Sequence, residues 1–186
     1  MVFQDPYGSL NPCLTVGQTL DEALRAAGTE EERADWRIRR ERIRDMLERV
    51  GLKEEDMDRY PSEFSGGQRQ RVGIARALIV RPEILICDEA LSSLDAVTQQ
   101  QILDLLLDIQ REQQIACLFI SHDMHVIRRV SSRIGVMYGG RLVETGRTRE
   151  VCSDPWHPST KLLLDASLDA APGSARRLRS LPAEQQ

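Results

Sequence analysis

The sequence predicts an α/β protein, in which parallel strands alternate with helices along the chain. Two short apolar segments, residues 84–87 and 116–120, have the length and composition of buried strands, and a helical stripe lies between them. A chain of 186 residues with 41% hydrophobic content is long enough for one domain with a substantial core. The order strand, helix, strand, helix therefore favours a parallel sheet covered by helices.

The first eighty residues predict a loop followed by a small helical unit. Turn-forming residues dominate the first dozen positions, at Pro6, Gly8, Asn11 and Pro12. A first helix should begin at a Thr15 or Thr19 cap, and a second should end at Gly51. The apolar stripes of these helices are Val16, Leu20 and Leu24 in the first, and Ile43, Met46, Leu47 and Val50 in the second.

The remaining elements follow from the same periodicities. A helix after Ser65 should end near Pro82, and the first strand, 84–87, is apolar enough to predict a central parallel strand without an exposed face. The helical stripes are Val72, Ile74, Ala75 and Leu78 in that helix, and Ile102, Leu105, Leu106 and Ile109 after the strand. A helix is expected around 126–130, and Gly139-Gly140 predicts a hairpin between 134–138 and 141–144. From Asp169 onward the composition predicts a disordered tail.

Charge and cysteine content narrow the class of protein. The net charge is −4, and the arginines between residues 33 and 49 alternate with glutamates, as on a solvated helix, so no nucleic-acid partner is predicted. The four cysteines show no C-x-x-C spacing, which favours reduced thiols in a cytosolic protein. No apolar run is long enough to cross a bilayer, and the amino terminus lacks the pattern of a signal peptide.

The segment Ser65-Gly66-Gly67-Gln68 has the composition of a phosphate-binding turn. It stands where a loop enters a helix, so unpaired backbone N–H groups and the positive end of the helix dipole can hold a phosphate, and the glycines permit close approach. Two glycines before a helix are more often a plain turn, but the longer run through Gln70, Arg71 and the following helix favours the functional interpretation.

Two carboxylates follow the first apolar strand and point to opposite sides of its end. Asp88 can hold Mg²⁺, and Glu89 can orient or deprotonate the water that attacks a γ-phosphate. His122 follows the second strand, and ligands bind at the carboxyl edge of such sheets. Gln4 could reach a metal or a water through its amide. His125 is expected to lie at the surface.

In this order, these residues resemble the ATP-binding cassette (ABC) subunit of a transporter, from Met1 to about Leu168. The resemblance implies an α/β P-loop NTPase core with a helical subdomain at about 13–80, and ATP and Mg²⁺ as cofactors. By this resemblance, Gln4 is the Q-loop glutamine, Ser65 to Gln68 are the signature motif, and Ile84 to Asp88 are the Walker B strand. Glu89 is then the catalytic base, Ser92 to Asp95 are the D-loop, in which Asp95 is a nucleotide-site residue, and His122 is the switch histidine. The resemblance also implies a metal held through Asp88 and Gln4.

Three further segments are similar to the dipeptide and oligopeptide importer cassettes, whose relatives also carry nickel or glutathione. They are residues 3–12, residues 137–144 and residues 154–164, and the last falls in an extension at about 145–168. Ala90 replaces the proline usual after the catalytic glutamate, and Ser159 replaces a usual aromatic residue. The implied partners are a second ATPase subunit and transmembrane permease subunits, which would place the chain peripherally on the cytoplasmic face of the cell membrane.

The phosphate loop of this family, G-x-x-x-x-G-K-[ST], is absent, because neither Lys53 nor Lys161 follows a glycine. In the family, two subunits enclose two nucleotides, and each site joins one chain's Walker A loop to the other chain's signature motif. We therefore expect a chain that needs an upstream segment or a complete partner, and that is poorly stable alone because the missing strand would leave an apolar sheet exposed.

Three interpretations follow. The first is a cassette ATPase of a peptide importer, of which this sequence begins at an internal methionine. The second is a truncated, non-hydrolysing subunit that lends its signature motif to a partner. The third, an ATPase that handles nucleic acid, is disfavoured because only 60 residues separate Gln4 from Ser65 and no heptad run or cysteine cluster lies between them.

Overall fold

The structure is a computed structural model that describes residues 1–5, 8–92 and 94–169. The chain divides into two compact units, Met1–Ile120 and Ser121–Gln186, and each is described separately below. Within the described residues, no helix is both long and apolar enough to cross a membrane. The expected tail lies outside the described residues apart from Asp169, which is the last residue of a helix.

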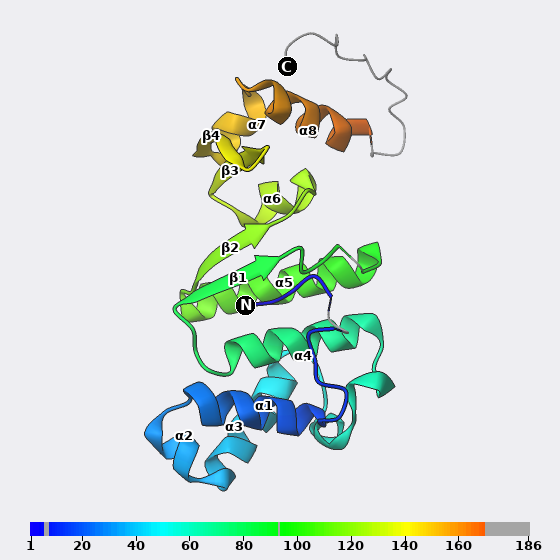
Figure 1. Cartoon of the computed structure of the whole chain (residues 1–186), viewed down its shortest axis with the longest axis vertical. Helices are drawn as coiled ribbons and strands as arrows, with labels where there is room; N and C mark the ends of the chain where they lie inside the picture. The colour runs from blue at the N-terminus through cyan, green and yellow to red at the C-terminus, as the bar shows by residue number, and fades with distance from the viewer. Residues whose placement is uncertain (6–7, 93, 170–186) are drawn as a thin grey trace. The chain divides into compact units, whose positions relative to one another are not determined.

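Three helices form the first part of the first unit (Figure 1): α1 (Val16–Ala27), α2 (Glu30–Ala34) and α3 (Trp36–Arg49). Thr15 caps α1 by accepting a hydrogen bond from the backbone N–H of Gln18, which decides between the two caps that the sequence allowed. The residues of both predicted apolar stripes are buried, and α1 contacts α3. The helix α2 was not predicted; it has five residues and is capped by Thr29.

Two short 3-10 helices, Glu54–Asp58 and Pro61–Glu63, lead to α4 (Gly66–Leu78). Arginines of α4 fix the preceding segments, because Arg71 donates to the carbonyl of Val50 at 2.7 Å and Arg76 donates to the carbonyl of Ser9 at 2.5 Å. Gly51 ends the α3 region with φ +73°, a conformation that favours glycine, as predicted for this stop.

The sheet of the first unit contains β1 (Ile84–Asp88) and β2 (Ala116–Ile120), joined by α5 (Ala96–Gln113). The two strands are parallel, with Ile86 beside Leu118, and Val2 forms a parallel bridge to Cys87 on the other side of β1. The predictions of a parallel strand and of the order strand, helix, strand, helix are therefore confirmed, whereas the central position predicted for the strand is met only by the isolated bridge to Val2. Figure 1 shows α5 running alongside β1, and α4 contacts α5.

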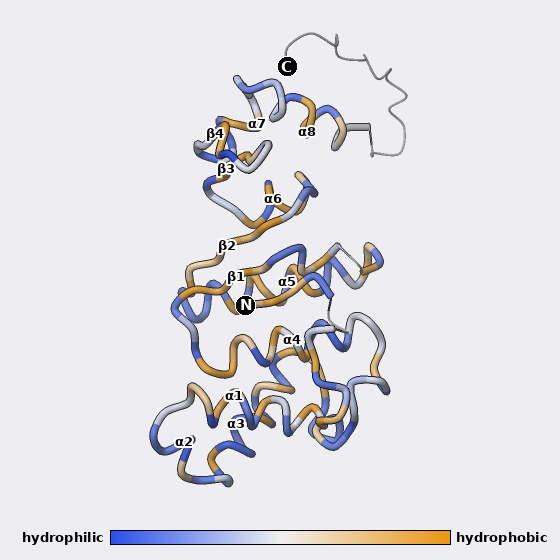
Figure 2. The backbone as a smooth tube through the Cα atoms, in the orientation of Figure 1, coloured by the Kyte–Doolittle hydropathy of each residue, from blue (hydrophilic) through white to orange (hydrophobic). Residues whose placement is uncertain are grey.

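One face of this sheet is apolar and exposed, which corrects the prediction that the strand 84–87 has no exposed face. Leu85 and Cys87 are buried, but Ile84 is 63% exposed. On the same face of β2, Leu118 is 53% and Ile120 46% exposed. Figure 2 shows both strands as hydrophobic segments of the tube. The strand has the composition of a two-sided buried strand, but only one of its faces is covered here.

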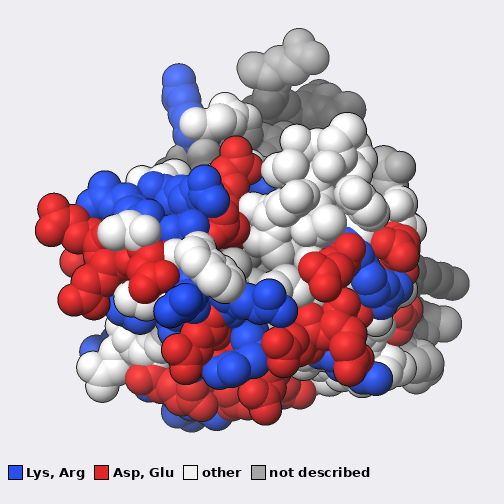
Figure 3. Space-filling view, turned by 90° about the horizontal axis from the view of Figure 1, so that it is seen from below, with Lys and Arg blue, Asp and Glu red and all other residues white. Residues whose placement is uncertain are grey.

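The helical end of the first unit carries interleaved charges (Figure 3), with acidic and basic side chains interspersed over its surface. On α3, for example, Arg44 pairs with both Glu41 and Asp45, and all three side chains are solvent-accessible. Exposed pairs of this kind contribute little to stability. They do prevent the arginines of α3 from forming a continuous basic surface of the kind that binds nucleic acid.

The second unit contains α6 (Met124–Val130), the antiparallel pair β3 (Arg133–Tyr138) and β4 (Arg141–Arg147), α7 (Thr148–Ser153) and α8 (Pro158–Asp169). The predicted helix around 126–130 and the predicted hairpin are both confirmed. Gly139 and Gly140 have φ of +55° and +75°, as a two-residue hairpin turn requires. The sequence analysis assigned no helix to the segment that forms α7 and α8.

Glu144 explains why two of the family-like segments occur together. This side chain is 3% exposed, and its carboxylate accepts hydrogen bonds from the backbone N–H groups of Trp156 and His157, both at 3.1 Å, and from the hydroxyl of Thr160. Burial alone would raise the pKa of Glu144, but the hydrogen bonds from Thr160, Trp156 and His157 hold it below its ordinary value. The carboxylate thus fastens the start of α8 to β4.

We expect the exposed apolar sheet face to drive self-association of the chain. Replacing Ile84 and Leu118 together by threonine should slow aggregation and leave the free energy of unfolding nearly unchanged, because both side chains are already accessible to water. Light scattering at several protein concentrations would measure the aggregation rate. The matched control Leu85→Thr, in a side chain that is 2% exposed, should instead lower the unfolding free energy by about 2–4 kcal/mol. Unchanged aggregation of the double variant would contradict the prediction.

We expect Glu144→Gln to destabilise the second unit by about 1–3 kcal/mol at pH 7, because a charge-assisted acceptor of three donors is lost. Since folding lowers the pKa of Glu144, its stabilising effect is present above its ordinary value of 4.5 and disappears as the pH falls through the lower folded value. Urea unfolding followed by Trp156 fluorescence, in a Trp36→Phe background, would measure this. The exposed control Glu150→Gln should have little effect, and an equal effect of both variants would refute the assignment.

Candidate functional site

The turn at Ser65 is a complete helix cap. The hydroxyl of Ser65 accepts from the backbone N–H of Gln68 at 3.3 Å, and the side-chain oxygen of Gln68 accepts from the N–H of Ser65 at 2.9 Å. Ser65 and Gly66 are exposed. A reciprocal cap of this kind fixes the entry of the chain into α4, and the N–H groups of Gly66 and Gly67 precede the first acceptor within the helix. The turn is therefore preformed and accessible.

The two glycines of this turn have different surroundings. A side-chain carbon at Gly67 would lie 2.4 Å from Cγ2 of Thr98 on α5, so Gly67 is required for the packing of α4 against α5. At Gly66 the corresponding carbon would meet only Leu94, at 3.9 Å. Packing therefore explains Gly67 within the chain itself, whereas Gly66 leaves open space over the turn, as close approach of a ligand would need.

The end of β1 presents the two predicted carboxylates. Asp88 is half-buried, and its backbone N–H donates to the carbonyl of Val2 at 2.9 Å. Glu89 is also half-buried and has φ +48°, which is uncommon for a residue other than glycine. The backbone N–H of Glu89 donates to the carbonyl of Ile120 at 2.9 Å, and this bond anchors the strained residue to the end of β2.

A residue that the sequence analysis did not single out connects these two parts of the site. Gln70 of α4 is 1% exposed, and its side-chain amide donates to the carbonyl of Ala90 at 2.6 Å. This bond joins the helix that begins at Ser65 to the residue directly after Glu89. The signal was present in the sequence, because Gln70 precedes Ile74 by four positions and so lies on the buried face of α4.

Gln4 and Asp95 lie near the same elements. Val2 pairs with Cys87, so the exposed Gln4, two residues further on, lies at the carboxyl edge of β1. Asp95 caps α5 by accepting from the N–H groups of Val97 at 3.1 Å and Thr98 at 3.0 Å. Hydrogen bonding by Thr98 and then by Val97 holds the pKa of Asp95 below its ordinary value.

His122 belongs to the second unit and lies two residues after the end of β2, where its side chain is exposed. Its role beside Asp88 and Glu89 stays a prediction. His125 is exposed, as expected, and its Nε2 lies 3.1 Å from the carbonyl oxygen of Ser167. Ser93, in the predicted D-loop, lies outside the described residues.

The fold and these residues define a class, the α/β ATPases whose chemistry lies at the carboxyl edge of a parallel sheet. Residues 1–92 match the ABC transporter family model. A solved structure with a similar fold is the ATP-binding cassette MJ0796 in a dimeric, post-hydrolysis state bound to ADP and phosphate. It has a TM-score of 0.67 and 30% identity, with 80% of this chain and 62% of that chain covered.

Curated relatives extend the match along the chain. The glutathione import ATP-binding protein GsiA of Salmonella typhimurium is 51% identical over 180 residues, covering 97% of this chain and 28% of the relative. The oligopeptide transport ATP-binding protein OppF of Bacillus subtilis is 48% identical over 169 residues, covering 89% of this chain and 53% of the relative. The chain belongs to the ABC transporter ATP-binding proteins and spans between about a quarter and half of the length of these relatives.

We expect Gln70→Leu to destabilise the first unit by about 1–3 kcal/mol, because the carbonyl of Ala90 would stay buried without its donor. Cys87 offers a local reporter, since burial raises the pKa of its thiol to about 12 and keeps it unreactive at neutral pH. Alkylation of Cys87 at pH 8 should therefore be faster in the variant. Gln100→Leu, at an exposed position of α5, is the matched control, and identical alkylation rates in the two variants would show that the bond is unimportant.

Proposed function

We propose that the chain is the ATP-binding and ATP-hydrolysing part of an ABC importer for peptides. The observation that carries the proposal is the buried bond from Gln70 to Ala90, because it fixes an exposed phosphate-binding turn and a pair of strand-end carboxylates to one another. The names of the relatives support the solute class, since glutathione is a small peptide and the other relative is named for oligopeptide transport. Hydrolysis needs the family's phosphate loop from a preceding segment or from a partner.

Each residue then has a defined task. Glu89 is the base that orients and deprotonates the attacking water, and His122 contacts the γ-phosphate. Ser65, Gly66, Gly67 and Gln68 hold the γ-phosphate of a nucleotide bound by a second cassette, with the exposed N–H groups of the first turn of α4 as donors. Asp95 caps α5 beside that turn and contacts the partner. The accessible position of Gly66, where an added side-chain carbon would meet only Leu94 at 3.9 Å, supports this assignment.

The donors for a magnesium ion fit the family's chemistry. Asp88 supplies one carboxylate at the edge of β1, and Gln4 supplies an amide oxygen from the neighbouring segment. The described residues contain no group of three His, Cys, Asp or Glu side chains that could hold a metal by themselves. Magnesium commonly uses one or two protein oxygens together with nucleotide phosphates, so the ion would bind with the nucleotide and neutralise charge on its phosphates.

The proposed partners are a second ATPase cassette and the permease subunits of the transporter, and no nucleic acid. The dimeric state described for MJ0796 supports the first of these. With the permease, the chain would lie peripherally at the cytoplasmic face of the cell membrane. A second function, in which the chain lends its signature turn to a complete cassette without hydrolysing ATP itself, is favoured by one observation: the turn at Ser65 is fully capped within this chain and needs no further segment.

An experiment with two arms tests the two functions. In the first arm, which tests hydrolysis, the chain is joined at Met1 to the preceding, phosphate-loop segment of the Bacillus subtilis relative, and ATP hydrolysis is measured. Glu89→Gln should lower the rate by about 100-fold or more while ATP binding persists, because general bases contribute on that order. The exposed control Glu83→Gln should retain the wild-type rate. A Glu89→Gln variant that hydrolyses ATP at the wild-type rate would refute hydrolysis at this site.

The second arm uses the unjoined chain, mixed with a complete cassette whose own signature serine is replaced by arginine. Stimulation of ATP hydrolysis by the wild-type chain and by Glu89→Gln, but not by Ser65→Arg, would establish the lending function. Absence of stimulation by the wild-type chain would exclude it. The two arms are independent, since the first reports on Glu89 and the second on Ser65.

A further inference from the structure

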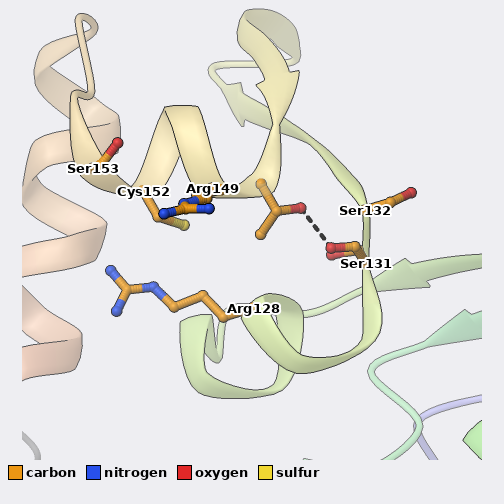
Figure 4. Close-up of a pocket in the computed structure, with 7 residues that line it drawn as sticks. Arg128, Ser131, Ser132, Arg149, Cys152 and Ser153 are labelled. Carbon is orange, nitrogen blue, oxygen red and sulfur yellow. Dashed lines mark hydrogen bonds between the residues drawn. The ribbon is translucent and has the colours of Figure 1, made fainter.

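A cavity in the second unit lies outside the proposed nucleotide site. It has a volume of about 490 Å³ and is bounded by the end of α6, the following loop and α7. Figure 4 shows Arg128 extending from α6 towards α7, and Arg149 and Cys152 on the facing helix. The lining also includes the hydroxyl-bearing residues Ser131, Ser132, Thr148 and Ser153. All of these residues belong to one compact unit.

The walls of this cavity are fixed by hydrogen bonds. The hydroxyl of the buried Thr148 donates to the carbonyl of Ser131 at 2.6 Å, a bond drawn in Figure 4, and the N–H of Thr148 donates to the carbonyl of Ser132 at 3.0 Å. The hydroxyl of Ser131 donates in turn to the carbonyl of Ile127. These bonds hold the end of α6 and the start of α7 at a set separation, so the two arginines project from a preformed frame.

The charge in the cavity is uncompensated. Among the residues that the structure describes, no carboxylate forms an ion pair with Arg128 or Arg149. Glu144, a buried carboxylate of the same unit, already accepts hydrogen bonds from Trp156, His157 and Thr160. Two guanidinium groups that face one space bind an oxyanion through paired N–H donors, and this geometry matches phosphate well.

We propose that this cavity binds a phosphate group carried by a larger molecule. The two arginines supply the charge, the exposed Ser132 adds a hydroxyl, and the volume exceeds what a single phosphate needs, which leaves room for the rest of an ester. A soluble phosphate ester and the headgroup of an anionic phospholipid share this chemistry. The residues that line the site include none of those proposed for the nucleotide site, Ser65, Asp88, Glu89 and His122.

Cys152 provides the measurement, because it lines the cavity and is half-buried. The full chain is treated with iodoacetamide at constant ionic strength, with sodium phosphate or with sodium chloride, and alkylation of each cysteine is followed by peptide mass spectrometry. Phosphate should slow the alkylation of Cys152 and leave the exposed Cys13 unaffected. Persistent protection of the buried Cys87 reports that the first unit is folded, and circular dichroism confirms that each variant keeps its helices.

Variants separate the site from general effects of salt. Arg128→Gln and Arg149→Gln should each raise the phosphate concentration needed for half-protection by about tenfold, the effect expected for one lost charge-assisted contact. Both positions are exposed on helices that tolerate glutamine, and Arg141→Gln on the exposed hairpin is the matched control. Protection that is unchanged in both arginine variants would overturn the proposal.

A second arm identifies the source of the phosphate. Vesicles of phosphatidylglycerol are compared with vesicles of phosphatidylcholine at equal lipid concentration. Protection of Cys152 by phosphatidylglycerol without an effect of soluble phosphate assigns the site to a lipid headgroup, and protection by soluble phosphate alone assigns it to a free ester. Equal alkylation of Cys152 with and without each probe would overturn the proposal in both forms.

Discussion

The hydrogen bond from Gln70 to the carbonyl of Ala90 determines the geometry of the first unit's functional edge. Beside this bond, α4 packs on α5, and without the bond the turn after β1 would carry a buried carbonyl without a donor. Glu89 holds a backbone conformation that costs free energy, and such residues persist only where the surroundings determine them fully. The bonds on either side of Glu89, from Gln70 to Ala90 and from Glu89 to Ile120, meet that requirement.

The exposed face of the sheet is explained by the composition of its strands and not by the chemistry of the functional edge. Ile84, Leu118 and Ile120 lie on the same side of the two paired strands, and side chains of this size are seldom left accessible together on a sheet. The strand sequence suits burial on both faces, so it is adapted to a larger sheet than β1, β2 and Val2 form. The relatives extend beyond the matched region, since this chain covers 28% of one and 53% of the other.

The sequence predicted the regular elements better than their surroundings. Apolar stripes at helical spacing located α1, α3, α4 and α5, and Gly139-Gly140 located the hairpin, because these signals are local. The short helix α2 and the helices α7 and α8 were missed, since each depends on a cap or on a distant acceptor. The clearest case is α8, which begins where the carboxylate of Glu144 accepts hydrogen bonds from two backbone N–H groups that lie 12 and 13 residues further along the chain.

The candidate site shows the same limit. Residue types and order were enough to select Asp88, Glu89 and the turn at Ser65, because their chemistry is specific. The hydrogen bond of Gln70 and the packing of Gly67 were not predicted from residue types, because both are contacts with residues 20 or more positions away. Position on the buried face of α4 was the only local sign of Gln70.

The state of the Ser65 turn bears on how such a site can be shared between two chains. Its cap is satisfied internally, because Ser65 and Gln68 exchange both hydrogen bonds, so the turn needs no ligand to hold its shape. A partner's nucleotide would therefore meet a preformed surface, and binding would lose less free energy to ordering than it would at a flexible loop. The strained turn at Glu89 has the opposite character, since its geometry depends on two bonds from separate elements. The turn at Ser65, which would be shared with a partner, thus keeps its shape through local bonds. The turn at Glu89, which would carry hydrolysis, depends on bonds from α4 and to β2.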